Sequence, residues 1–222
     1  MRARHIKIKV NGFGKVEVVA PPGVGSDDIH HFVQTNTAWI YKTIDRLKDD
    51  RLNHPDLGFK PPKNISLLSS SKNYVVSYLP VVKKPAIVEN GLEILVYASS
   101  ESDSISLLRN WIQKKAKQTL VPWLHDVSTL HHIEFNKVSI RGQKTRWGSC
   151  SSKKNINLNR NLLFLKPDLV NYLMVHELSH IIQPNHSKHF WSQVAQCEPN
   201  YRKLDKELSQ SHKIVPLWAY AN

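Results

Sequence analysis

The sequence predicts an α+β protein, with an N-terminal β-rich module that contains one helix and a C-terminal module that mixes strands and helices. Short segments of alternating apolar and polar residues, typical of half-buried strands, dominate the N-terminal part. Longer segments with apolar residues at helical spacing are prominent in the rest. Because the composition changes near Ser99 and Ser100, we expect the two modules to comprise residues 1–100 and 101–222.

The N-terminal module is expected to begin with a hairpin. Residues 5–10 and 15–20 alternate basic or polar with apolar positions on either side of a glycine-containing loop. Ser26 and the two aspartates that follow it are typical of a helix start, and an apolar stripe then predicts one helix over 26–48. Residues 49–64 are rich in proline and are expected to form a loop.

Short strands and a long helix come next. The strands are expected at 65–68, 74–79, 86–88 and 92–97. The helix is expected over 103–124, where apolar residues recur at intervals of three and four.

The C-terminal module is expected to add three strands and three helices. The strands are predicted at 133–141, 145–150 and 156–163, the last two as a pair joined by a polar turn. The helices are predicted at 167–183, 188–196 and 199–208.

Composition and length set broad limits on what this protein can be. The chain has 222 residues, of which 41% are hydrophobic, as expected of a soluble globular protein with one large or two small domains. No apolar run reaches the ~20 residues needed to span a membrane, and the N-terminus has no apolar signal core. We therefore expect a cytoplasmic protein without membrane contact. Cys150 and Cys197 lie in no CxxC pair and are expected to be reduced thiols.

The chain is strongly basic, with a net charge of +13. Such an excess favours a polyanionic partner such as nucleic acid or a nucleotide. Any single cluster of basic residues also fits a solvated surface. The clusters are Arg2/Arg4/Lys7/Lys9, Lys114/Lys115/Lys117 and Lys137/Arg141/Lys144/Arg146.

The predicted helix 167–183 contains an HExxH pattern. His176 and His180 are four residues apart, so their side chains point the same way and can bind one metal ion. Glu177 lies about 100° further round the helix, where it can accept a proton from a metal-activated water. Two histidines and a glutamate on an otherwise apolar helix would be costly to bury without partners.

A third histidine follows the helix. Pro184 disfavours further helix, so the chain can turn there and bring His186 back toward the first two histidines. Ser187 can cap the helix that follows. Three histidines and an open position form a typical catalytic zinc site, and we expect one Zn²⁺ per chain.

These motifs and their surroundings resemble the YgjP-like family of zinc metallohydrolases, which is itself similar to the SprT-like and WLM-type metalloproteases. The resemblance covers most of the chain, and its residues are QKTRWGSCS at 143–151, Asn157-Leu158-Asn159, the HExxH pattern, Asn185-His186-Ser187 and Phe190-Trp191. It implies a zincin-like catalytic module with an HExxH helix, zinc ligands His176, His180 and His186, and Glu177 as general base. The ligand spacing also matches metzincins, but those have glycine in place of Gln183 and a later methionine that this chain lacks.

Three functions are compatible with these features. The first is a zinc-dependent, metallopeptidase-like hydrolase with Glu177 as base. The second is a nucleotide pyrophosphatase acting on nucleoside triphosphates, which the positive charge favours, although the chain has no GxxxxGK[ST] loop. The third is a nucleic-acid-associated binding module with a structural zinc.

The sequence leaves the substrate-binding residues open. Arg146, His189 and Tyr201 are candidates for stabilising an oxyanion, and each is as compatible with a structural or surface role. The predicted strand 156–163 is expected to lie along the active-site cleft as an edge strand, so that an extended peptide could pair with it.

Overall fold

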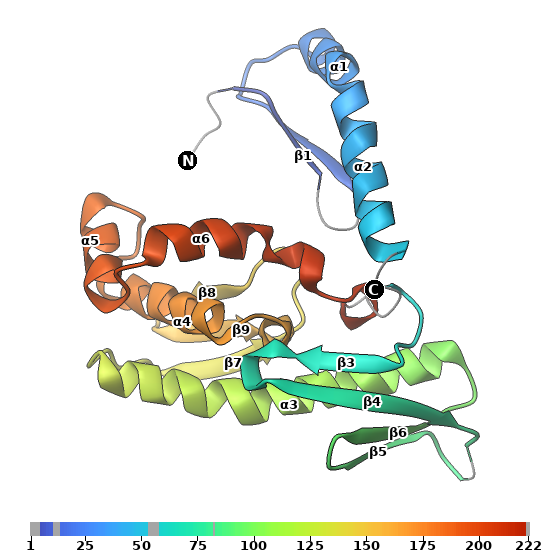
Figure 1. Ribbon diagram of the computed structural model, residues 1–222. Coiled ribbons are helices and arrows are strands. Elements are labelled where there is room, and N and C mark those ends of the chain that lie inside the picture. The colour runs from blue at the N-terminus through green and yellow to red at the C-terminus, as the bar shows by residue number, and fades with distance from the viewer. Residues whose placement is uncertain (1–4, 11–13, 53–57, 82, 221–222) are drawn as a thin grey trace.

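The computed structural model describes residues 5–10, 14–52, 58–81 and 83–220 (Figure 1). Two N-terminal sheets precede a region in which α-helices pack around a third sheet. The α+β class predicted from the sequence is therefore confirmed. No helix in the described ranges is long and apolar enough to cross a membrane.

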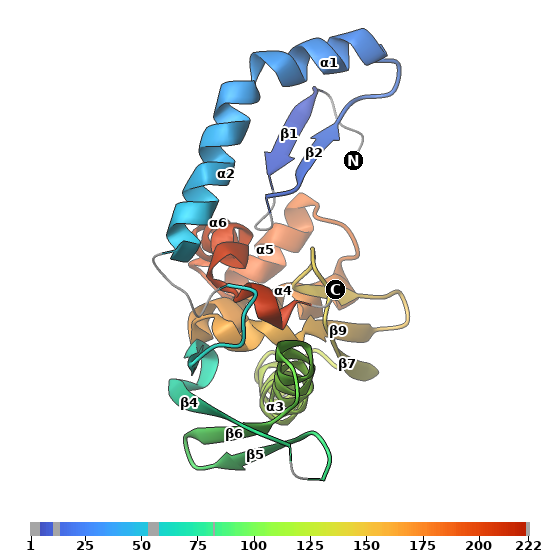
Figure 2. The ribbon, with the colours of Figure 1, turned by 90° about the vertical axis from the view of Figure 1, so that its right-hand side faces the viewer.

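The first four elements form a unit that projects from the rest of the protein, which we call the arm (Figures 1 and 2). It consists of the strands β1 (Lys7–Val10) and β2 (Val16–Val19) and the helices α1 (Ser26–Thr35) and α2 (Thr37–Leu52). The two strands pair antiparallel, which confirms the predicted hairpin; the residues at 11–13 of its loop lie outside the described ranges.

The prediction of one helix over 26–48 was wrong, because the chain breaks at Asn36 into α1 and α2. The Asn36 side-chain amide donates to the carbonyl of Phe32 at 2.8 Å, and the Thr37 hydroxyl donates to that of Val33 at 3.0 Å. Side chains of this kind compete with the backbone for hydrogen bonds and favour helix ends. The apolar spacing continues through the break, so periodicity alone could not show it.

The second sheet packs against the longest helix. Its strands are β3 (Asn64–Leu67), β4 (Lys72–Leu79), β5 (Ala86–Asn90) and β6 (Glu93–Tyr97), in the order β3-β4-β6-β5 with β4 and β6 parallel. All four were predicted. Alternate residues of β6, Ile94 and Val96, are fully buried and face the core.

The long helix α3 (Glu101–Leu130) extends beyond the predicted end at residue 124. Ser100 caps its N-terminus by accepting a hydrogen bond from the Asp103 backbone N–H at 3.1 Å. Val127, one turn after Leu124, is buried, and this contact with the core favours the additional turns.

The third sheet and three helices complete the protein. The strands β7 (Lys137–Arg141), β8 (Gly148–Cys150) and β9 (Asn155–Asn159) have the order β7-β9-β8. The helices are α4 (Pro167–Ile182), α5 (Lys188–Cys197) and α6 (Tyr201–Gln210). One buried cluster runs from Ile65 to Tyr220 and so includes residues on both sides of residue 100. The division into modules at that point stays a prediction.

Candidate metal centre

The helix α4 carries the HExxH residues into the core. Pro167 occupies its first turn, where its missing N–H costs nothing, and Asp168 lies beside the positive end of the helix dipole. Leu173, Met174 and Leu178 are almost fully buried. The helix ends at Ile182, and Gln183 is extended ahead of Pro184, as the residue before a proline prefers.

The turn after α4 brings His186 next to the other two histidines. Ser187 begins α5 by accepting a hydrogen bond from the Phe190 backbone N–H at 3.4 Å, as expected of a capping serine. The ligand atoms of His176, His180 and His186 all lie within 4.8 Å of one another. Phe190 is fully buried beneath them, and its ring stacks on His180 at 4.5 Å between centroids.

The ring nitrogens of this cluster face one another. Nε2 of His176 and Nε2 of His186 are 3.1 Å apart. Two nitrogens that bind one zinc ion in a tetrahedron, each at about 2.1 Å, are separated by about 3.4 Å. The donor atoms and their spacing therefore fit a metal ion held by three imidazoles.

Partners outside the cluster orient two of the rings. The Tyr172 hydroxyl donates to Oδ1 of Asp205 at 2.8 Å, and Nδ1 of His176 lies 3.4 Å from the same hydroxyl oxygen. Since that O–H is already used, His176 can only donate its Nδ1–H to Tyr172. Nδ1 of His180 lies 3.3 Å from the Gln183 carbonyl, which can only accept. Both contacts favour the tautomer that leaves Nε2 free for a metal.

Tyr172 and Asp205 were not predicted from the sequence as residues of the site. Tyr172 is fully buried and stands four residues before His176, on the same face of α4, so helical spacing could have identified it. Asp205 belongs to α6, and its contact with Tyr172 depends on the packing of two helices that no local pattern reports.

The surroundings of His176 and His180 favour the neutral imidazole, the form that binds a metal. Burial lowers the pKa of His176 to about 3, with further contributions from the neighbouring His180 and His186. Burial likewise lowers the pKa of His180.

Glu177 occupies a separate, tightly enclosed position on α4. Only 5% of its surface is exposed, and burial raises the pKa of its carboxyl group to about 8. Its carboxylate lies against the backbone of Gly148 in β8, where an added Cβ would come within 2.6 Å of Oε1. A residue without a side chain at 148 therefore makes room for Glu177.

The prediction that residues 156–163 form an edge strand along the cleft was wrong. The strand expected at 156–163 as an edge is β9, which pairs with β7 on one side and with β8 on the other. Its predicted second half is a 3₁₀ helix, Arg160–Phe164, because the Asn159 side chain caps it by accepting from the Asn161 N–H at 3.0 Å. In the described sheet the outer strand beside α4 is β8.

The three candidates for an oxyanion stabiliser differ in their surroundings. The Tyr201 ring stacks on Trp191 with 5.4 Å between centroids, and Trp191 in turn lies 5.6 Å from the His186 ring. Arg146 and His189 are exposed. A role for any of the three stays a prediction.

Comparison with protein families identifies a metallopeptidase domain in this chain. Residues 4–211 match the family described as YgjP-like, metallopeptidase domain. A search of curated proteins found no match. Among solved structures, the metallopeptidase zymogen of Pyrococcus abyssi abylysin is similar at 22% identity and a TM-score of 0.39, over 42% of this chain and 94% of that one. Since the family match extends over nearly the whole chain, this protein belongs to the YgjP-like metallopeptidase family.

Proposed function

We propose that this protein is a zinc-dependent peptidase in which His176, His180 and His186 hold the metal and Glu177 is the general base. The observation that carries the proposal is a three-histidine cluster next to a buried carboxyl group, with His176, Glu177 and His180 on α4 and His186 in the turn that follows. Three imidazoles converge within 4.8 Å, and the buried Glu177 adjoins two of them in sequence without being a member of that cluster. A structural zinc site would use a fourth protein ligand, whereas a catalytic site keeps one position open.

The metal and Glu177 would have separate roles in peptide hydrolysis. Bound zinc would supply Lewis acidity, polarising the scissile carbonyl and acidifying the attacking water. Glu177 accepts the proton of that water at its carboxylate and then gives it to the leaving amine. Phe190 and the buried face of α4 form an apolar floor under the histidines, while His186 is exposed at the solvent side.

The outer edge of β8, which pairs with no strand in the described ranges, supplies a binding surface for an extended peptide. The Trp147 carbonyl accepts from Asn159 N–H at 2.8 Å, and the Ser151 N–H donates to the Asn155 carbonyl at 2.9 Å. Hydrogen-bonded residues alternate along an antiparallel strand, so the backbone groups of Gly148 face away from β9. A peptide that pairs with them would pass directly beside Glu177.

The test compares zinc-loaded wild type with Glu177→Gln on an unfolded protein and on nucleoside triphosphates. The exposed Glu134→Gln provides a matched control with the same change in charge. We expect wild type and control to cleave the unfolded protein, and Glu177→Gln to keep its zinc but lose roughly 10²- to 10⁴-fold in rate.

Each other outcome identifies a different function. Hydrolysis of triphosphates without proteolysis would make the protein a nucleotide pyrophosphatase. Zinc binding without hydrolysis of either substrate would favour a binding module. Full activity of Glu177→Gln would exclude Glu177 as the base.

A further inference from the structure

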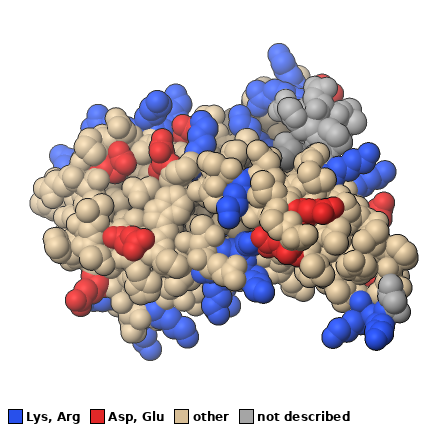
Figure 3. Space-filling view, turned by 60° about the horizontal axis from the view of Figure 1, so that its bottom comes forward, with Lys and Arg blue, Asp and Glu red and all other residues tan. Residues whose placement is uncertain are grey.

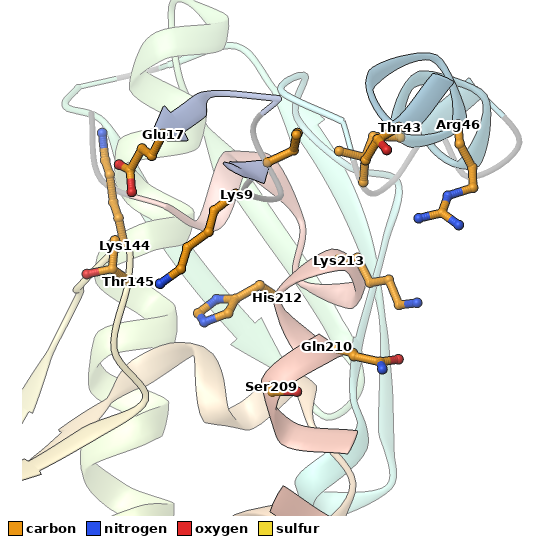
Figure 4. Close-up of a pocket in the computed structure, with 12 residues that line it drawn as sticks. Lys9, Glu17, Thr43, Arg46, Lys144, Thr145, Ser209, Gln210, His212 and Lys213 are labelled. Carbon is orange, nitrogen blue, oxygen red and sulfur yellow. The ribbon is translucent and has the colours of Figure 1, made fainter. Parts of the chain in front are cut away.

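A cavity lies between the arm and the rest of the protein, and none of the three histidines lines it (Figure 4). Its volume is about 610 Å³. Residues of β1, β2 and α2 line it on the arm side, and residues of the loop before β8 and of the end of α6 line it on the other. We call this cavity the arm groove.

The arm groove is strongly basic. Lys9 and Arg46 line it from the arm, and Lys144 and Lys213 line it from the opposite wall (Figure 4). The one carboxylate among the lining residues belongs to Glu17, which already forms an ion pair with Lys15 at 3.6 Å. By contrast, acidic and basic side chains are interspersed on the face shown in Figure 3. Positive charge is therefore less mixed with acidic groups in the groove than on that face.

Uncharged hydrogen-bond donors lie between these cations. The hydroxyl group of Thr145 and the amide of Gln210 line the same space. Lys9 extends from β1 toward Thr145 and His212 in the middle of the groove (Figure 4). Cations on both walls with neutral donors between them suit a ligand whose phosphates are spread along its length.

An exposed tryptophan continues the arm wall of the groove. Trp39 is 49% exposed, and it precedes Thr43 and Arg46 on the same face of α2 at spacings of four and seven residues. Seven residues of helix correspond to about 10 Å, so a ligand that contacts both Trp39 and Arg46 is longer than one phosphate group. An exposed indole near cations is typical of sites that stack nucleic-acid bases.

We propose that the arm groove binds single-stranded nucleic acid, with phosphates on Lys9, Arg46, Lys144 and Lys213 and a base stacked on Trp39. A single strand is favoured over a duplex because only unpaired bases can leave the stack and lie against a side chain. It is favoured over a free nucleotide because the four cationic groups point to different parts of the groove and do not converge on one point (Figure 4).

The test measures binding of a fluorescein-labelled oligothymidylate of about 15 nucleotides to the whole protein, by fluorescence anisotropy over a range of salt concentrations. Arg46→Ala/Lys213→Ala removes one cation from each wall. Each lost phosphate contact should reduce the slope of log K against log salt by about 0.7, so the double variant should lose about 1.4 in slope and about 25-fold in affinity near 0.1 M salt. Lys84→Ala/Lys117→Ala, at exposed positions outside the groove, removes the same charge and should bind like wild type.

Two further measurements separate a nucleic-acid strand from other anions. Trp39→Ala should weaken binding at least about fivefold and leave the salt slope unchanged, because stacking releases no counterions. Protein stripped of metal should bind with full affinity, whether or not the protein is a peptidase.

Several results would overturn the proposal. Equal losses in the groove and control double variants would mean that only net charge matters. Unchanged binding by Trp39→Ala, or displacement of the oligonucleotide by polyglutamate at equal charge concentration, would show that the groove accepts polyanions without recognising bases.

Discussion

The lack of space for a side chain between position 148 and Glu177 makes Gly148→Ala an informative substitution at the proposed active site. A Cβ atom at position 148 would lie 2.6 Å from Oε1 of Glu177 and 2.8 Å from its Cγ and Cδ atoms. Ordinary van der Waals contact begins at 3.4 Å, so the carboxylate has to move by the difference, about 0.8 Å. Gly148 does not have a positive φ, so alanine adds crowding without backbone strain.

A displacement of this size has a predictable effect on the rate. A misplacement of about 1 Å in a catalytic group can reduce the rate about 100-fold, so we expect kcat to fall by roughly 30- to 100-fold. Zinc affinity should change little, because the added methyl group points at Glu177 and not at a histidine ring. Crowding in a packed region also costs about 1–3 kcal/mol of stability, which thermal unfolding should detect.

The assay compares kcat on an unfolded protein substrate with zinc affinity measured by competition with a chelator. Gly25→Ala is the control, since its Cβ would meet only Asp28 Oδ2 at an ordinary 3.5 Å. Wild-type kcat in Gly148→Ala would refute the reasoning, because it would mean that the position of Glu177 does not limit the reaction. A loss of zinc together with activity would place the effect on the metal site instead.

Three other substitutions test the same site. Tyr172→Phe removes the acceptor for Nδ1 of His176 and should lower zinc affinity about 10- to 100-fold, as measured by chelator competition. His186→Ala removes a proposed ligand and should lower it further; unchanged zinc content would exclude His186. In metal-free protein the folded-state pKa of Glu177, about 8, exceeds its ordinary value of 4.5, so the free energy of unfolding should fall as pH rises between these values. Glu177→Gln should abolish that contribution and be more stable than wild type at pH 8 by denaturant titration, and an identical pH profile would contradict the assigned pKa shift.

Local patterns predicted most of the secondary structure. The hairpin and the four strands of the second sheet follow from alternation, because a strand with one buried face must place apolar residues at every second position. The break at Asn36 escaped prediction because it depends on side-chain hydrogen bonds that leave the apolar period intact.

The central position of β9 in the third sheet could not be predicted from the sequence. The residues of β9 are compatible with an edge strand and with a central strand. Only the pairing with β7 on one side and β8 on the other shows that the strand is central. β7 and β9 are separated in the sequence by β8, and a three-residue strand such as β8 gives almost no periodic signal.

In the candidate sites, too, residues from one segment could be predicted and contacts between segments could not. His176, Glu177 and His180 come from one helix, and their spacing alone indicated a shared face. The contact between Tyr172 and Asp205 joins two helices, and the arm groove draws on five segments from β1 to the turn after α6. Lys144 was recognised as part of a basic cluster, but its convergence with Lys9 across the groove requires the tertiary fold.

The short outer strand β8 also bears on self-association. An unpaired strand edge can recruit a strand from another copy of the chain as readily as it recruits a substrate, and long flat edges nucleate aggregates for that reason. β8 has only three residues, Gly148–Cys150, too few to hold a second protein chain by backbone hydrogen bonds alone. Lengthening this strand to improve substrate affinity would therefore carry a cost in solubility.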